Sequence, residues 1–246
     1  MAVDSGSVRE GLTSAHDGER NRLLNALPVD EYDRMLSELR PVHLPLKEVL
    51  IEPNVAISHV WFVREGVASM IAHDQGGGLI EVGTIGREGF VGLPLLNGVD
   101  RMPYEVLIQI EGDAWRMPAD AFRRIIDERP AVRHRCSLFA QYFSDQMAQS
   151  VACNRLHTVD ERCARWILMT HDRVDGDQFE LTQEFLAIML GVRRAGVSVA
   201  MGVLQRSNVL TYVRGRVTVL DRDALETKAC DCYRITSEAQ RRLFSE

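Results

Sequence analysis

The hydrophobic pattern of the chain changes once, at Pro118, and this change limits the folds that the chain can adopt. Before Pro118, short runs rich in β-branched and aromatic residues, such as VLIE at 49–52 and HVWFVR at 59–64, alternate with glycine, proline and asparagine. Such runs are typical of strands, and a series of them separated by turns indicates a closed barrel or roll. After Pro118, apolar residues recur at three- and four-residue steps, which is the period of a helix. We therefore expect an α+β fold in which a β-roll precedes the helices.

Length and composition indicate two globular modules joined by a connector. The 246 residues exceed the usual size of one domain, and a content of 46% hydrophobic and 26% charged residues is ordinary for a folded protein. The expected parts are a disordered N-terminal tail at 1–22, a β-roll sensor domain at 23–129, a long helix with a hinge at 130–154, and a C-terminal domain at 155–246.

The long helix carries a stripe of residues at the spacing of a coiled-coil seam. The stripe consists of Cys136, Phe139, Phe143, Met147 and Ser150. We expect these side chains to pair with the same residues of a second copy, so that the helix forms a homodimer. The alternative, in which the helix packs on its own roll, has the same periodicity and stays open.

The segment after residue 181 has the pattern of a helix-turn-helix. One helix is expected at 182–190, a turn at Gly191 and a second helix from about Arg194. Glycine at the turn lets two helices cross steeply, as this motif requires. Two short β-like runs at 210–220 follow and indicate a hairpin wing. This arrangement predicts a winged helix-turn-helix that binds double-stranded DNA, since a wing adds phosphate contacts beside the helix.

Charge is distributed unevenly in a way that suits DNA binding. The net charge is −6, so contacts with nucleic acid need a local patch. Between Phe185 and Leu220 there are five arginines and no acidic residue. Exposed amides at a helix start attract phosphate, and arginine can also bind guanine in the major groove. The candidate DNA-binding residues are Arg193, Arg194, Gly196, Ser198, Arg206, Arg214 and Arg216.

The stretch 182–220, the sequence CNRLHTVDERCARWILMTHDRV at 153–174 and the β-rich first half together resemble the Crp/Fnr family of transcription regulators. The resemblance implies a homodimer whose recognition helices enter successive major grooves of a pseudo-palindromic site, with RNA polymerase as a further partner if the protein activates. Arg194 matches the family's base-contacting arginine. Ala195 and Val199 differ from the Glu and Arg of cyclic-AMP-responsive members, so we expect a different site sequence.

The effector pocket that the resemblance implies is degenerate. Cyclic-nucleotide-binding members carry a Glu for the ribose and an Arg-Ser pair for the phosphate, within a segment that corresponds to 89–106. The corresponding pocket residues here are Gly92, Leu93, Arg101, Met102 and Tyr104. Leu93 replaces the Glu, and Arg101 reaches the arginine position only with a shift in register. Because a buried phosphate without a cation is poorly compensated, we expect a regulator that cyclic AMP does not control.

The five cysteines lack the CxxC spacing of zinc sites, and an odd number suits a reducing compartment. We interpret them as free thiols and expect no metal and no cofactor. Cys230 and Cys232 are interpreted as structural or incidental, and a redox pair of Cys153 and Cys163 stays an alternative. An iron-sulfur centre lacks the N-terminal cysteines it would need in this family.

Two other classes of protein are weighed against a regulator. A cyclic-nucleotide- or other small-ligand-binding module would not need a winged helix-turn-helix. A cupin-like metalloenzyme would need clustered histidines, but no HxH or HxxxH pattern occurs, and no P-loop, nucleophile elbow or dinucleotide fingerprint is present. We therefore expect no enzyme activity. Without a signal peptide or a long apolar run, we expect a cytoplasmic protein that does not bind a membrane.

Overall fold

The computed structural model describes residues 19–245. A disordered tail was expected at 1–22. Residues 1–18 of it lie outside the described range, and the expectation of disorder is wrong for residues 19–22. Asn21 is buried, caps helix α1 (Arg22–Asn25) by accepting the Leu24 N–H, and donates from Nδ2 to the carbonyls of Val63 and Gly89 at 2.7 and 2.8 Å. A buried amide with these partners holds the start of the chain against the roll.

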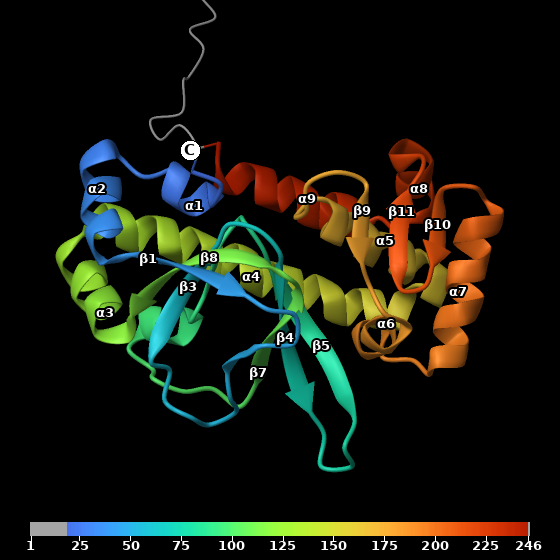
Figure 1. Cartoon of the computed structure of the whole chain (residues 1–246), viewed down its shortest axis with the longest axis horizontal. Coiled ribbons are helices and arrows are strands. Elements are labelled where there is room, and N and C mark those ends of the chain that lie inside the picture. The colour runs from blue at the N-terminus through green and yellow to red at the C-terminus, as the bar shows by residue number, and fades with distance from the viewer. Residues whose placement is uncertain (1–18, 246) are drawn as a thin grey trace, which may run out of the picture.

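The N-terminal half is a roll of two four-stranded antiparallel sheets (Figure 1). The first sheet has the order β1 (Arg40–Leu44), β8 (Gly112–Pro118), β3 (His59–Val63) and β6 (Phe90–Val91). The second has the order β2 (Val49–Ile51), β7 (Glu105–Ile110), β4 (Val67–His73) and β5 (Leu79–Ile85). The fold class expected from the sequence is thereby confirmed for this half.

Aromatic side chains fill the roll and connect it to the helices. The rings of Phe62, Phe90 and Phe122 lie 5.3–6.4 Å apart, and Phe90 lies 5.6 Å from Phe139 of the long helix. Phe122 belongs to α3 (Ala119–Glu128), which starts directly after Pro118. Two further short elements complete this domain: α2 (Val29–Glu38) and the 3₁₀ turn η1 (Leu93–Asn97).

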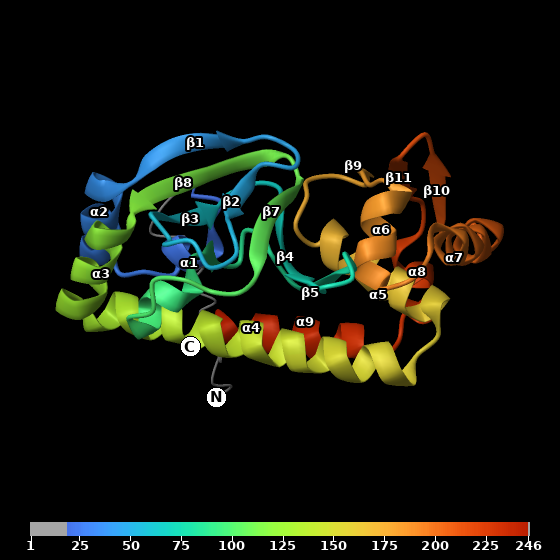
Figure 2. The same ribbon diagram turned by 90° about the horizontal axis from the view of Figure 1, so that it is seen from below.

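Helix α4 (Pro130–Leu156) spans 27 residues and runs along both halves of the molecule (Figure 2). The stripe predicted as a dimer seam faces the protein's own roll, so that prediction is wrong. Cys136, Phe139 and Phe143 are buried, and a Cβ at Gly89 or Gly83 would overlap the two phenylalanine rings. The remaining two stripe residues, Met147 and Ser150, are half-buried, against Gly83 and Arg165. A helix packed on a sheet needs the same period as a dimer seam, which explains the error.

The C-terminal half has its own apolar core and a three-stranded sheet, β10-β11-β9. Its elements are α5 (Val159–His171), β9 (Gln178–Glu180), α6 (Gln183–Leu190), α7 (Arg194–Arg206), β10 (Leu210–Val213), β11 (Arg216–Val219), α8 (Arg222–Lys228) and α9 (Cys232–Leu243). Helix α9 returns along α4, as both views show (Figures 1 and 2). The long helix is therefore held by the roll on one side and by α9 on another.

Buried polar contacts dock the C-terminal domain on the roll. Trp166 of α5 donates from Nε1 to Glu81 of β5 at 2.9 Å, and the other Glu81 oxygen accepts from Ser69 at 2.8 Å. Arg173, two residues beyond α5, bonds to Glu88 of the roll. These contacts fix the position of the α5–α7 unit relative to the two sheets.

Between residues 19 and 245, no single helix is long and apolar enough to cross a membrane. Helices α6 and α7 pass that test only as a pair, on length and composition, and they are bent by 100° relative to each other.

Candidate nucleic-acid interface

Helices α6 and α7 form the helix-turn-helix at the positions expected from the sequence. Thr182 caps α6, its hydroxyl accepting the Phe185 N–H at 3.2 Å. Helix α6 ends at Gly191, whose φ of 60° is left-handed and favours glycine. The 100° bend between the two helices follows from this short turn. It leaves the start of α7 projecting from the domain.

Helix α7 has one buried and one exposed face. Val197, Ala200, Met201 and Leu204 enter the core of the domain. The exposed face carries Arg194, Ala195, Ser198, Val199 and Gln205. Polar and apolar groups side by side on one helix face are what base-edge recognition in a major groove uses.

Two residues on this exposed face were not among the candidate DNA-binding residues. Val199 is 67% exposed, although valine in a helix usually enters the core, and a methyl group there suits contact with the methyl of thymine. Gln205 lies at the far end of the same face. The signal that could have found both is their helical spacing from Arg194 and Ser198.

The other predicted residues on α7 are Gly196, Ser198 and Arg206. Gly196 is half-buried, and a Cβ there would be 3.5 Å from Val192, an ordinary contact, so the packing does not demand glycine. Arg206 is exposed in the last turn. The Ser198 hydroxyl donates to the Arg194 carbonyl at 3.1 Å and can turn to another acceptor.

The wing is a tight hairpin of β10 and β11. Arg214 and Gly215 both have positive φ, 50° and 81°, as a two-residue hairpin turn with right-handed strand twist requires. Arg216 pairs with Glu180 at 3.1 Å, but both side chains are exposed, so the pair is weak and can open. The predicted arginines 214 and 216 thus stand together at the tip of the wing.

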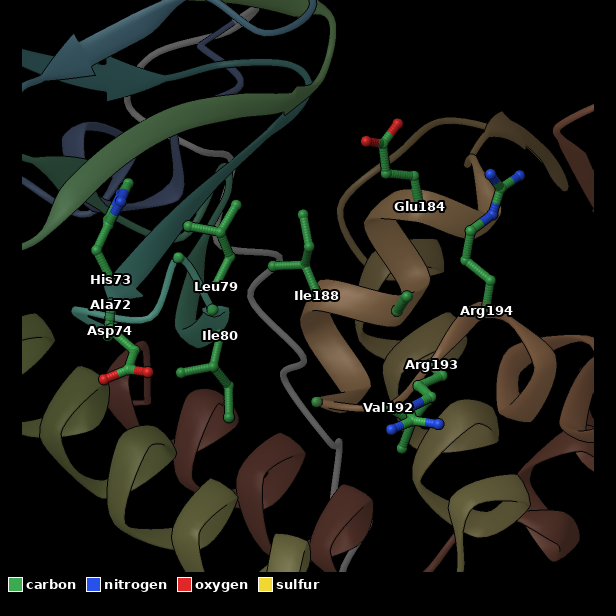
Figure 3. A pocket seen from close by; sticks show the side chains of 14 residues that line it. Ala72, His73, Asp74, Leu79, Ile80, Glu184, Ile188, Val192, Arg193 and Arg194 are labelled. Carbon is green, nitrogen blue, oxygen red and sulfur yellow. The ribbon is translucent and has the colours of Figure 1, made fainter.

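Arg193 and Arg194 line a cleft of about 720 Å³ between the helix-turn-helix and the tip of the β4–β5 hairpin (Figure 3). His73 and Asp74 line the opposite wall. At the edge of this cleft the domains touch, since a Cβ at Gly191 would lie 3.3 Å from the side chain of Ile80. The β4–β5 hairpin therefore packs beside the turn between α6 and α7.

The degenerate effector residues do not gather into one polar site. Met102 is buried in the roll core, whereas Arg101 is exposed and pairs with its neighbour Asp100 at 3.1 Å. Tyr104 is exposed, and Leu93 is half-buried in η1. Gly92 has a φ of 112°, and a Cβ there would come within 2.7 Å of Val60. The cation that could hold a phosphate therefore faces solvent and not the core.

Three of the five cysteines lie together, although their spacing in the sequence gives no sign of this. Cys163 lies in the core of the C-terminal domain, where burial raises its pKa to about 12 and its thiol contacts Met201. Cys153 is not beside it and lies next to Cys230 and Cys232. The alternative of a redox pair of Cys153 and Cys163 is therefore excluded by their positions.

Two family models match the chain, one in each half. Residues 41–129 match the cyclic nucleotide-binding domain, and residues 161–228 match the Crp-like helix-turn-helix domain. Among curated protein sequences, none matches the chain significantly.

Solved structures share the fold over 78–84% of this chain. A Crp/Fnr-family transcriptional regulator from Eubacterium rectale has 20% identity and a TM-score of 0.63, covering 84% of this chain and 96% of its own. FixK2 from Bradyrhizobium japonicum has 13% identity and a TM-score of 0.67, with coverage of 78% and 98%. The c-di-GMP-responsive regulator CLP from Xanthomonas campestris has 15% identity and a TM-score of 0.62, with coverage of 78% and 99%.

The two domain matches stand in the same order as the roll and the winged helix-turn-helix of the structure. The chain belongs to the Crp/Fnr family of DNA-binding transcription regulators.

Proposed function

We propose that this regulator is a homodimer that binds a pseudo-palindromic double-stranded DNA site and controls transcription there without cyclic AMP as its effector. The observation that carries this proposal is the exposed face of α7, which begins with two arginines and lies beside a positively charged wing. The proposed role is recognition and not catalysis. Because the DNA of a bacterium lies in the cytoplasm, the proposed location of the protein is also the cytoplasm. RNA polymerase is a further partner if the protein activates.

The proposed dimer contact is the outer face of α4, which neither the roll nor α9 covers. Exposed residues recur there at alternating three- and four-residue steps: Ser137, Gln141, Ser144, Ala148 and Val151. Ser137, Ser144 and Ala148 are small enough for two helices to approach closely, and Val151, 73% exposed, offers apolar surface at one end. A second copy of this chain is the occupant that the family, whose members are typically dimers, favours.

In such a dimer the two α7 helices would enter major grooves about one helical turn, or roughly 34 Å, apart. Arg194 and Val199 would lie toward base edges, whereas Gln205 Oε1 accepts the Tyr212 N–H of β10 at 3.0 Å. Arg214 and Arg216 on the wing would lie toward phosphates, which position the protein and carry no base information.

The exclusion of cyclic AMP rests on two residues of the roll. Met102 occupies the core near the expected phosphate site, and Arg101 is turned to solvent. A cyclic phosphate in the roll would then lack the charge-assisted hydrogen bonds that normally stabilise it.

Selection from a random-sequence DNA library with the full-length protein tests the proposal. We expect a two-fold symmetric motif that becomes degenerate at one base position of each half-site with Arg194→Ala but not with Arg234→Ala, which removes an exposed arginine of α9 paired with Glu238. An unenriched library, or a motif without symmetry, would contradict the proposal.

A further inference from the structure

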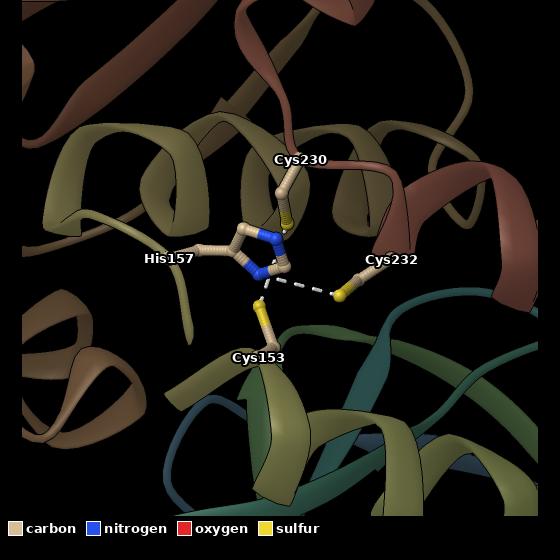
Figure 4. Close-up of side chains that lie close together, drawn as sticks. All are labelled: Cys153, His157, Cys230 and Cys232. Atoms are coloured by element: carbon tan, nitrogen blue, oxygen red, sulfur yellow. Dashed lines mark hydrogen bonds between the residues drawn. The ribbon is translucent and has the colours of Figure 1, made fainter. Parts of the chain in front are cut away.

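The last turns of α4 and the start of α9 bring three cysteines and a histidine together (Figure 4). Cys153 lies in the last turn of α4, and His157 is the residue that caps the C-terminus of this helix, its N–H donating to the Cys153 carbonyl at 3.2 Å. Cys230 lies in the short connection between α8 and α9, and Cys232 is the first residue of α9. All four ligand atoms lie within 4.8 Å of one another.

Two distances within this group match the spacing of ligand atoms around a single tetrahedral ion. Cys153 Sγ lies 3.5 Å from Cys230 Sγ, and Cys232 Sγ lies 3.5 Å from Nδ1 of His157. Zinc–sulfur and zinc–nitrogen bonds of about 2.3 and 2.0 Å at tetrahedral angles place neighbouring ligand atoms roughly 3.5–3.8 Å apart. Three cysteines with one histidine are also a common ligand set of structural zinc, and thiolates disfavour magnesium and calcium.

A positive charge and a hydrogen-bond donor lie beside the four residues, and both would stabilise an ion bound by thiolates. Three thiolates around a divalent ion leave a net charge of about −1. Arg165 is 7% exposed, and its Nε has no hydrogen-bond partner in the part of the chain that the structure describes. It lines a small cavity together with Cys153 and Arg162. Gln149 donates from Nε2 to Cys232 Sγ at 3.0 Å, which would orient that ligand.

We propose that Cys153, His157, Cys230 and Cys232 bind one zinc-class divalent ion. Binding releases the three thiol protons, uses the neutral imidazole through Nδ1, and involves no change in oxidation state. The ion would join the end of α4 to the start of α9, and thereby fix the C-terminal helix of the DNA-binding domain on the long helix. This site is independent of the DNA-contacting residues.

Elemental analysis of the full-length protein, purified under reducing conditions, measures the occupancy. We expect about one zinc ion per chain, falling to less than about a tenth in Cys153→Ala and Cys232→Ala. Cys163→Ala is the matched control, because that buried cysteine lies outside the cluster, and it should keep its zinc. Metal-free protein titrated with Co²⁺ should develop the intense visible absorption of tetrahedral thiolate coordination, and Zn²⁺ should abolish it.

The melting temperature of the metal-free wild type tests the proposal without variants, which could fail to fold. The metal-free wild type should melt at a lower temperature, and Zn²⁺ but not Mg²⁺ should restore the original value. The proposal is overturned if the metal-free wild type takes up neither Co²⁺ nor Zn²⁺ at micromolar concentration. It is equally overturned if the double variant Cys153→Ala, Cys232→Ala keeps its metal, or if protein purified without air contains a Cys153–Cys230 disulfide in place of a metal.

Discussion

Arg173 of the DNA-binding domain and Glu88 of the roll form an ion pair sealed from solvent. The guanidinium bonds to one Glu88 oxygen through Nη2 at 2.7 Å and Nε at 3.0 Å, and the two side chains are 3% and 0% exposed. Burial alone would lower the pKa of Arg173, but the negative charge of Glu88 raises it. The pair is thus the most deeply buried polar link between the two domains among the ion pairs of residues 19–245.

Removing one partner of this pair should destabilise the protein strongly. Glu88→Gln leaves the Arg173 charge buried without compensation, at a cost on the order of 3–5 kcal/mol in the free energy of unfolding. Urea unfolding measures this, with Glu238→Gln in the exposed pair with Arg234 as the control, expected to cost below about 0.5 kcal/mol. If both variants unfold at the same urea concentration, the buried pair does not hold the domains.

Stability should depend on pH through Glu81. Enclosure of its carboxyl group raises the pKa to about 7, against the opposing hydrogen bonds from Trp166 and Ser69. Below about pH 4.5 both states are protonated and the group contributes nothing. Between pH 4.5 and 7 the unfolded chain loses its proton while the folded chain keeps it, so stability falls as the pH rises, and above 7 the loss is complete.

Glu81→Gln should remove this component. Melting temperatures of wild type and variant, measured across that pH range, should diverge as the pH rises, with the variant the more stable at high pH. Because all other groups titrate alike in both proteins, the difference isolates Glu81. Parallel curves would show that Glu81 ionises as readily in the folded state as in the unfolded chain.

The outer face of α4 should control the oligomeric state. Val151→Glu places a charge on the proposed contact and should give a monomer that keeps its fold, whereas Phe139→Glu buries a charge in the roll and should unfold it. Sedimentation together with circular dichroism distinguishes the two outcomes. Val29→Glu, an equally apolar exposed position on α2, is the control and should remain a dimer. A Val151→Glu variant that sediments as a dimer at micromolar concentration would exclude this face.

Cyclic nucleotides should bind poorly. With Met102 in the core and Arg101 paired with Asp100 at the surface, neither cyclic AMP nor cyclic GMP meets a buried cation in the roll. Isothermal titration calorimetry should therefore give no binding in the micromolar range. A micromolar or tighter dissociation constant for either nucleotide would contradict the assignment of the pocket.

The sequence predicted what depends on local pattern and missed what depends on tertiary contacts. Gly191 and the hairpin at Arg214 were predictable, because turn chemistry and period identify them. The role of Phe139 was not, since a seam and a sheet-packed helix share one spacing. The proximity of Cys153 and Cys230 needed the return of α9 along α4, which no local pattern encodes. The docking of Asn21 under the roll was hidden for the same reason.

In the proposed complex, α7 recognises bases while the wing contacts phosphates. The most direct test is binding of a selected site and a scrambled site across a salt series, for wild type, Arg194→Ala and Arg216→Ala. Arg194→Ala should cost on the order of 1–3 kcal/mol per half-site and relax the preference at one base position. Arg216→Ala should weaken both sites alike and lower the salt slope by about one unit per lost phosphate contact. If Arg194→Ala instead lowers both affinities equally and leaves the preference unchanged, Arg194 holds phosphate and α7 does not recognise bases through it.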